Sequence, residues 1–238
     1  MAKHGKKYLA AAAKVDPNKN YAPEEALALV KETSAAKFDA TVEVHIRLGI
    51  DPRQSDQQVR GVCLMPGGLG KTVRILVFAE GDGARIAQEA GADFVIDSDE
   101  GYNKIKGGWT DFDVAMAVPE AMKKVGGLGR VLGARGLMPN PKAGTVAPAN
   151  DIPRLIREAR AGRAEFRIDK TANVHVPIGK VSFGVDKLTL NFAALMDALK
   201  KAKPASSKGT YLRKVVLAST MGPGVKVDVN EAQSMEEA

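Results

Sequence analysis

The sequence has one cysteine, Cys63, among its 238 residues, and only 5% of the residues are aromatic. A single cysteine excludes an intramolecular disulfide and fits a reducing compartment. No run approaches ~18 apolar residues, which argues against a transmembrane helix. The apolar stretch 8–13 is too short and too rich in alanine for a secretory signal. We expect a cytoplasmic globular protein that has no contact with a membrane.

Acidic residues are absent from two long stretches, 121–150 and 198–227, and the formal net charge is +7. The second stretch carries Lys200, Lys201, Lys203, Lys208, Arg213, Lys214 and Lys226. Uncompensated positive charge favours a polyanionic partner. Within this stretch a strand-like run, 211–218, ends at Ser219, Thr220, Met221 and Gly222. Cations, a hydroxyl donor and bare backbone together suit a phosphate–sugar chain, so the sequence predicts a nucleic-acid surface here.

The chain also lacks the residue patterns of an active site. His4, His45 and His175 are far apart, and no cysteine or carboxylate joins them at metal-ligand spacing. Ser182 and Ser219 have no evident base partner, and no paired carboxylates stand out. We therefore predict a protein that is not an enzyme and uses no metal or cofactor.

Two glycine-rich runs invite a nucleotide-binding interpretation, and both fail it. The motif of a P-loop needs a glycine five residues before Gly70, where Met65 stands, and the run leads into a strand rather than a helix. The run 126–136 lacks the third glycine of a dinucleotide fingerprint at Leu132 and follows a helix. We interpret the first run as an interdomain hinge and the second as a basic loop surface.

The two ends of the chain resemble each other in pattern. Residues 41–48 alternate strictly between apolar and polar, as in an antiparallel strand with one open face. Residues 23–36 and 187–201 predict helices, and 61–64, 211–218 and 225–229 predict further strands. A turn at 169–173 predicts a hairpin between strands near Phe166 and Val176.

The middle of the chain has a different pattern. Apolar runs at 73–79, 93–96 and 112–118 alternate with helical segments at 85–91, 101–107, 119–124 and 152–161. Buried strands that alternate with helices indicate a parallel βαβ domain. We predict an α/β protein with a discontinuous α+β domain, residues 1–68 and 161–238, that has an antiparallel sheet. A three-layer α/β domain, 69–160, is inserted in it, with hinges near 67–70 and 160–162.

Several runs of residues resemble one known family. They are the start 3–6, residues 36–43, 48–53 and 128–142, and the late run 219–223. In this order they resemble the bacterial L-one family of large-subunit ribosomal proteins, over nearly the whole chain. The resemblance implies the same split fold, with an inserted domain that is Rossmann-like.

The resemblance also implies a function. Proteins of this family bind large-subunit rRNA, form the mobile stalk beside the tRNA exit site, assist release of deacylated tRNA, and often repress translation of their own mRNA. The positions that match the family's RNA contacts are Lys37, Phe38, Thr41, Glu43, Gly179, Lys180, Ser182, Lys214, Thr220, Met221 and Gly222. The expected partners are large-subunit rRNA, exit-site tRNA and the leader of the chain's own mRNA, with the free protein a monomer.

A secondary basic surface is expected from Lys3, Lys6, Lys7, Lys123, Lys124, Arg130, Arg135 and Lys142, although the terminal lysines also fit a solvated tail. The chain departs from the family at Gly67, usually histidine, at Ala134, usually proline, and at Lys214, where some relatives have a small hydroxyl residue. Two alternatives stay open: an enzyme that binds a nucleotide in the inserted domain, and an RNA-binding regulator that never joins the ribosome.

Overall fold

The computed structural model describes residues 4–235, and the chain forms two compact units. Unit 1 comprises residues 1–70 and 162–238, and unit 2 comprises residues 71–161. The predicted mixture of helices, one antiparallel sheet and one parallel sheet is confirmed. Lys3 lies outside the described residues, and so does the side chain of Lys142.

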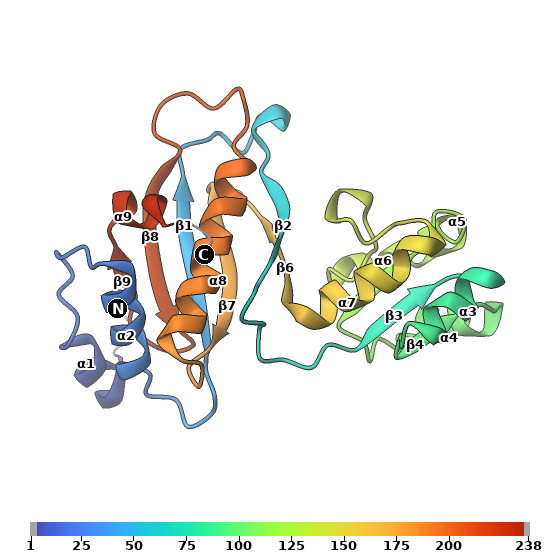
Figure 1. Cartoon of the computed structure of the whole chain (residues 1–238), viewed down its shortest axis with the longest axis horizontal. Coiled ribbons are helices and arrows are strands. Elements are labelled where there is room, and N and C mark those ends of the chain that lie inside the picture. The colour runs from blue at the N-terminus through green and yellow to red at the C-terminus, as the bar shows by residue number, and fades with distance from the viewer. Residues whose placement is uncertain (1–3, 236–238) are drawn as a thin grey trace. The chain divides into compact units, whose positions relative to one another are not determined.

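Unit 1 is built on a four-stranded antiparallel sheet in the order β7-β1-β8-β9 (Figure 1). Its strands are β1 (Thr41–Leu48), β7 (Asn173–Lys180), β8 (Leu212–Ser219) and β9 (Val225–Val227). Every second residue of β1, from Val42 to Leu48, is buried. Helices α2 (Pro23–Glu32) and α8 (Val185–Lys201) pack their apolar sides against this face. The opposite face, with Glu43, carries the polar half of the alternation.

A separate two-stranded ribbon, β2 (Arg60–Leu64) with β6 (Arg163–Arg167), completes the strands of unit 1. The predicted hairpin is therefore wrong in its pairing. Strand β6 pairs with β2, and only Ile168 forms a bridge to Val174 across the turn. Asp169 organises that turn instead, because its carboxylate accepts hydrogen bonds from the backbone N–H groups of Thr171 and Asn173.

The ends of unit 1 are more helical than the sequence indicated. Lys6–Ala12 forms α1, in a segment that the sequence leaves open as either a solvated tail or part of a basic surface. Val229 begins helix α9 (Val229–Ser234) rather than extending the last strand. The Asp228 carboxylate caps α9 by accepting from Asn230 N–H and Glu231 N–H. One 3-10 turn, η1 (Ser55–Gln57), precedes β2.

Unit 2 is a three-layer α/β domain around a parallel sheet in the order β4-β3-β5. Leu76 and Phe78 of β3 (Ile75–Phe78) face one apolar cluster, and Ile75 and Val77 face the other. The other strands are β4 (Phe94–Ile96) and β5 (Val114–Ala117), and the helices are α3 (Asp82–Glu89), α4 (Asp99–Lys106) and α7 (Ile152–Gly162).

The segment after β5 corrects two sequence interpretations. The predicted helix at 119–124 begins later, as α5 (Met122–Val125). The glycine-rich run is also helical, as η2 (Gly126–Leu128) and α6 (Gly129–Ala134), because Leu128 and Leu132 anchor it in the core below. Two further 3-10 turns follow, η3 (Pro141–Ala143) and η4 (Ala149–Asp151).

Two features of residues 4–235 bear on function. None of the helices described there combines the length and the hydropathy needed to cross a membrane. Within the same part of the chain, His, Cys, Asp and Glu side chains nowhere gather in threes that could hold a metal ion.

Candidate nucleic-acid interface

Three strand ends meet at one edge of the unit 1 sheet. Strand β1 lies between β7 and β8 and is antiparallel to both, so its first residues lie beside the last residues of each neighbour. Thr41 pairs with Lys180 at the end of β7, and Val42 pairs with Ser219 at the end of β8. The residues of this edge form the strand-end cluster: Lys37, Phe38, Thr41, Gly179, Lys180, Ser182, Thr220, Met221 and Gly222.

Thr41 and Thr220 join the two halves of the cluster. The N–H of Thr220 donates to the carbonyl oxygen of Thr41 at 2.9 Å, and the N–H of Thr41 donates to Thr220 Oγ1 at 3.1 Å. The Thr220 hydroxyl itself lies 3.3 Å from the Thr41 carbonyl oxygen. Since Thr220 Oγ1 already accepts one bond, it offers a partner one remaining lone pair.

The turn that follows β8 is tightly constrained. Gly222 N–H donates to the Ser219 carbonyl oxygen at 2.8 Å, which closes a four-residue turn. Its third residue, Met221, has φ of +66°, a conformation that a residue with a side chain adopts only under strain. A Cβ on Gly222 would lie 2.2 Å from Ser219 Oγ, so this position accepts only glycine while Ser219 keeps its place.

Ser219 is a residue of this turn whose role the sequence did not reveal. Its side chain is 4% exposed, and its hydroxyl has no hydrogen-bond partner within the described residues. A buried hydroxyl without a partner is destabilising. Its burial under Gly222 could be found only from the folded turn.

The end of β7 presents its groups through a β-bulge. The register of β1 against β7 shifts between Val42 and Glu43, opposite Gly179. A Cβ on Gly179 would lie 2.8 Å from Leu188 and 2.9 Å from Phe183, so the backbone packs closely there. Lys180 Nζ donates to Thr41 Oγ1 at 2.9 Å, which holds the ammonium group at the beginning of β1.

Ser182 is engaged with Asp39, a residue that sequence reasoning did not include. Its backbone N–H donates to Asp39 Oδ1 at 3.1 Å and its hydroxyl donates to Asp39 Oδ2 at 2.8 Å. The pair fixes the loop before β1 against the loop after β7. Ser182 is thus placed to position this loop, and its Oγ can still accept a bond.

The outward-facing part of the cluster is apolar and cationic. Phe38 is 60% exposed and Met221 is 79% exposed, on the loops before β1 and after β8. Lys37 beside Phe38 is also exposed and forms no ion pair within residues 4–235. Exposed apolar side chains beside lysines and bare backbone can stack on bases or riboses while the lysines meet phosphates.

Glu43 and Lys214 lie on the open face of the sheet rather than at its edge. Glu43 is two residues into β1, on the same face as Thr41. Lys214 pairs with Arg47 at the far end of β1. The distance along β1 from Thr41 to Arg47 is about 20 Å, so Lys214 is well separated from Thr220.

The secondary basic surface is divided between the units. Lys6 and Lys7 are exposed on α1 in unit 1, whereas Lys123, Arg130 and Arg135 are exposed in unit 2. Lys124 differs from its neighbours, because it forms ion pairs with Glu80 at 3.0 Å and with Asp99 at 3.1 Å. Hydrogen bonds to these two carboxylates raise the pKa of Lys124, and they offset its charge.

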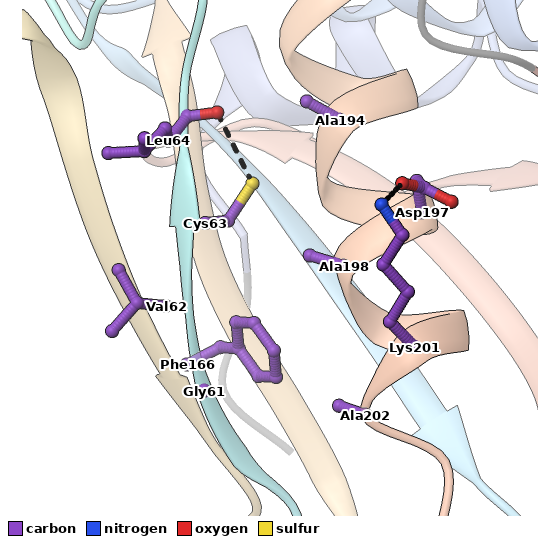
Figure 2. A pocket seen from close by; sticks show the side chains of 10 residues that line it. All are labelled: Gly61, Val62, Cys63, Leu64, Phe166, Ala194, Asp197, Ala198, Lys201 and Ala202. Atoms are coloured by element: carbon purple, nitrogen blue, oxygen red, sulfur yellow. Dashed lines mark hydrogen bonds and ion pairs between the residues drawn. The ribbon is translucent and has the colours of Figure 1, made fainter. Parts of the chain in front are cut away.

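A groove of about 470 Å³ lies between β2, β6 and α8 (Figure 2). It is lined by Gly61, Val62, Cys63, Leu64, Phe166, Ala194, Asp197, Ala198, Lys201 and Ala202. Asp197 and Lys201 pair at 2.6 Å on one side, and Cys63 Sγ lies 3.5 Å from the Leu64 carbonyl oxygen on the other. The remaining lining is apolar.

These features define a class of protein: a two-unit α/β protein whose polar, cationic and exposed apolar groups gather at strand ends, apart from the residues that line the groove. The model of the ribosomal protein L1p/L10e family matches residues 30–223. The chain is 58% identical over 236 residues to the large ribosomal subunit protein uL1 of Chloroflexus aurantiacus, which covers 99% of this chain and 100% of the relative. It is 57% identical over 234 residues to the protein of the same name from Macrococcus caseolyticus, covering 98% and 100%.

The chain therefore belongs to the ribosomal protein L1p/L10e family. This confirms the resemblance drawn from the sequence motifs.

Proposed function

We propose that this protein is a structural protein of the large ribosomal subunit, in the cytoplasm, and that it binds large-subunit rRNA directly through the strand-end cluster. The observation that carries the proposal is the meeting of three chain segments, 37–41, 179–182 and 220–222, at one sheet edge. Relatives over the full chain are large-subunit proteins by name, which supports the same assembly here.

The chemistry of the cluster suits RNA held by shape and backbone. Met221 and Phe38 present apolar surface to riboses or bases, and the free lone pair of Thr220 Oγ1 accepts from a 2′-hydroxyl. Lys37 and Lys180 meet phosphates. The Glu43 carboxylate accepts a hydrogen bond from an RNA hydroxyl, and Lys214 contacts a further phosphate at the far end of the open face.

The finer roles in this proposal come from the family resemblance. The protein forms the mobile stalk beside the tRNA exit site, assists release of deacylated tRNA, and represses its own mRNA through an rRNA-like element; free, it is a monomer. Exposed Lys123, Arg130 and Arg135 of unit 2 offer a surface for tRNA. The proposed division into domains 1–68 with 161–238 and 69–160, hinged near 67–70 and 160–162, would let that surface move.

Glycines support the proposed hinge. Gly68, Gly70 and Gly162 all have positive φ. A Cβ on Gly162 would lie 2.8 Å from Gly68 Cα, so the two connecting segments pass too closely for a side chain.

Substitution of Met221, the most exposed large apolar side chain among residues 4–235, tests the rRNA interface. Met221→Asp should weaken binding to a large-subunit rRNA fragment by more than tenfold, because a carboxylate would be desolvated against RNA. Leu190→Asp is the matched control, since Leu190 is an exposed apolar residue of helix α8 and does not belong to the strand-end cluster. Equal affinities of the two variants would place the interface elsewhere.

A sedimentation experiment distinguishes the proposed function from the alternative of an RNA-binding regulator that never joins the ribosome. The proposed function predicts that the protein co-sediments with large subunits and that a crosslinker at position 221 joins it to rRNA. Binding to an mRNA leader without association with subunits would favour the regulator. The enzyme alternative requires a nucleotide-binding loop in the inserted domain, whereas Gly126–Leu128 and Gly129–Ala134 form helical turns.

A further inference from the structure

Two histidines from distant segments touch at the centre of the open face of the sheet. His45 of β1 pairs with His175 of β7 in the sheet register, and their Nδ1 atoms lie 2.8 Å apart. The imidazole rings meet edge to face, with centroids 5.0 Å apart. Both side chains are accessible, at 34% for His45 and 51% for His175.

This geometry fixes how many protons the pair can hold. An Nδ1–Nδ1 hydrogen bond contains one proton, so the pair carries either no charge or one positive charge while the bond exists. A second positive charge would put protons on both Nδ1 atoms and break the bond. The contact therefore resists full protonation, unless an anion arrives to receive the second Nδ1–H.

Each imidazole also has a carboxylate near its outer nitrogen. Glu43 Oε2 lies 3.9 Å from His45 Nε2, and Asp169 Oδ2 lies 3.6 Å from His175 Nε2. Burial opposes ionisation of Asp169, but the hydrogen bonds from Asn173 and Thr171 hold its pKa well below the usual range. Asp169 thus stays ionised throughout the range in which imidazoles titrate.

Other charged groups around the pair come from every strand of the sheet. On the same face β1 contributes Arg47, β7 contributes Lys180, β8 contributes Lys214 opposite Arg47, and β9 contributes Lys226 opposite Val216; Lys170 lies in the turn beside Asp169. Cations thus stand on both sides of the two histidines along β1. The span from Lys180 to Lys214 is about 20 Å, enough for several phosphates of an RNA strand.

We propose that the His45–His175 pair is a phosphate-binding site for RNA, which continues the strand-end cluster across the open face of the sheet. The inference rests on the proposed RNA-binding function and adds a site to it. When a phosphate oxygen reaches the pair, it accepts a hydrogen bond from an imidazole N–H and favours the protonated form. RNA binding is then coupled to uptake of a proton.

The free protein opposes that protonation. Burial lowers the pKa of His45, and the charge of His175 lowers it further, whereas Glu43 acts in the opposite direction. By linkage, acid should strengthen RNA binding while it weakens the fold, because the unfolded chain takes up the proton more readily than free folded protein does. A general effect of acid on stability would weaken RNA binding, whereas protonation of the histidine pair should strengthen it, so the two effects can be distinguished.

The test compares the full-length protein with a double variant, His45→Asn with His175→Asn. Asparagine keeps a polar group near each Nδ1 position but cannot be charged. Affinity for a large-subunit rRNA fragment is measured at pH 8.0 and 6.0 at one ionic strength, with His4→Asn as the matched histidine control. We expect wild type and the control to bind about tenfold more tightly at the lower pH, and the double variant to show no gain.

A second readout monitors the imidazoles directly. NMR titration with inorganic phosphate should shift the resonances of His45 and His175 and raise the pH at which they titrate, leaving His4 unchanged. If the double variant does not fold, His175→Asn alone serves, because that side chain is half exposed and removing it leaves no pair to share a proton.

The outcomes are distinguishable. If wild type and the double variant bind RNA with the same pH dependence, the phosphate site at His45 and His175 is refuted. The proposed function stays intact in that case, provided that Met221→Asp still weakens RNA binding by more than tenfold. Failure of wild type to bind rRNA at either pH would refute the proposed function, and the phosphate titration would then decide this site by itself. Absence of any histidine shift with phosphate would overturn it.

Discussion

Thr41 and Thr220 are 179 residues apart in sequence and hold each other through reciprocal hydrogen bonds at the edge of one sheet. Thr41 begins the central strand and contributes its backbone N–H and carbonyl oxygen, whereas Thr220 follows the neighbouring strand and contributes its backbone N–H and its hydroxyl. The turn after β8 is consequently held by Thr41, a residue of the first part of the chain. The conformation of this turn depends on the hydrogen bonds between Thr41 and Thr220 as well as on the residues of the turn itself.

Met221→Gly should stabilise the protein and weaken RNA binding. Glycine adopts φ of +66° freely, so we expect a gain of about 0.5–1 kcal/mol, while affinity for rRNA falls at least ~tenfold through loss of the exposed side chain. Chemical denaturation and filter binding measure the two effects. Ala172→Gly is the control, because Ala172 has φ of +61° but is buried in the turn after β6. It should gain similar stability with unchanged affinity.

Ser219→Ala should leave the protein as stable as wild type or raise its free energy of unfolding by about 1 kcal/mol, because it removes a buried hydroxyl that has no partner. Gly222→Ala alone should cost about 1–3 kcal/mol through the clash with Ser219 Oγ. In the double variant the clash is gone, and most of that stability should return. Additive effects in a double-mutant cycle would contradict this packing relationship.

Affinity for rRNA should fall steeply as salt rises, since phosphates are neutralised by lysines. Lys37→Gln should reduce the slope of log K against log salt by about 1. Lys19→Gln is the control, because Glu25 already pairs with that ammonium group at 2.7 Å. If the slope of log K against log salt is unchanged in Lys37→Gln, Lys37 does not contact a phosphate.

Asp113 should make unit 2 sensitive to acid. The hydrogen bond from Lys71, together with those from Arg74, lowers the pKa of Asp113 from 3.8 to about 2 although burial opposes this. A lowered carboxyl pKa contributes stability that is fully present above the unfolded value and is lost as pH falls toward 2. Asp113→Asn should therefore cost about 1–2 kcal/mol at pH 7 and much less near pH 2, as measured by urea unfolding.

The sequence by itself determined which faces of the four-stranded sheet of unit 1 and of the parallel sheet of unit 2 are buried. Strict alternation in β1 required one buried face, and continuous apolar runs in β3 and β5 required burial on both faces. The local pattern of apolar residues predicts this burial because side chains two residues apart in a strand lie on the same face of the sheet. The family motifs could likewise be recognised without coordinates.

Only the tertiary structure decided which segments meet. Strand β6 pairs with β2 rather than with the strand after its turn, and the glycine-rich run is helical because core contacts of Leu128 and Leu132 override the low helix propensity of glycine. The tie between Asp39 and Ser182, the hydroxyl of Ser219 under Gly222 and the contact of His45 with His175 all join groups that no local pattern relates. Pairing across long sequence separations depends on the packing of the whole unit, and that is where the candidate interface arises.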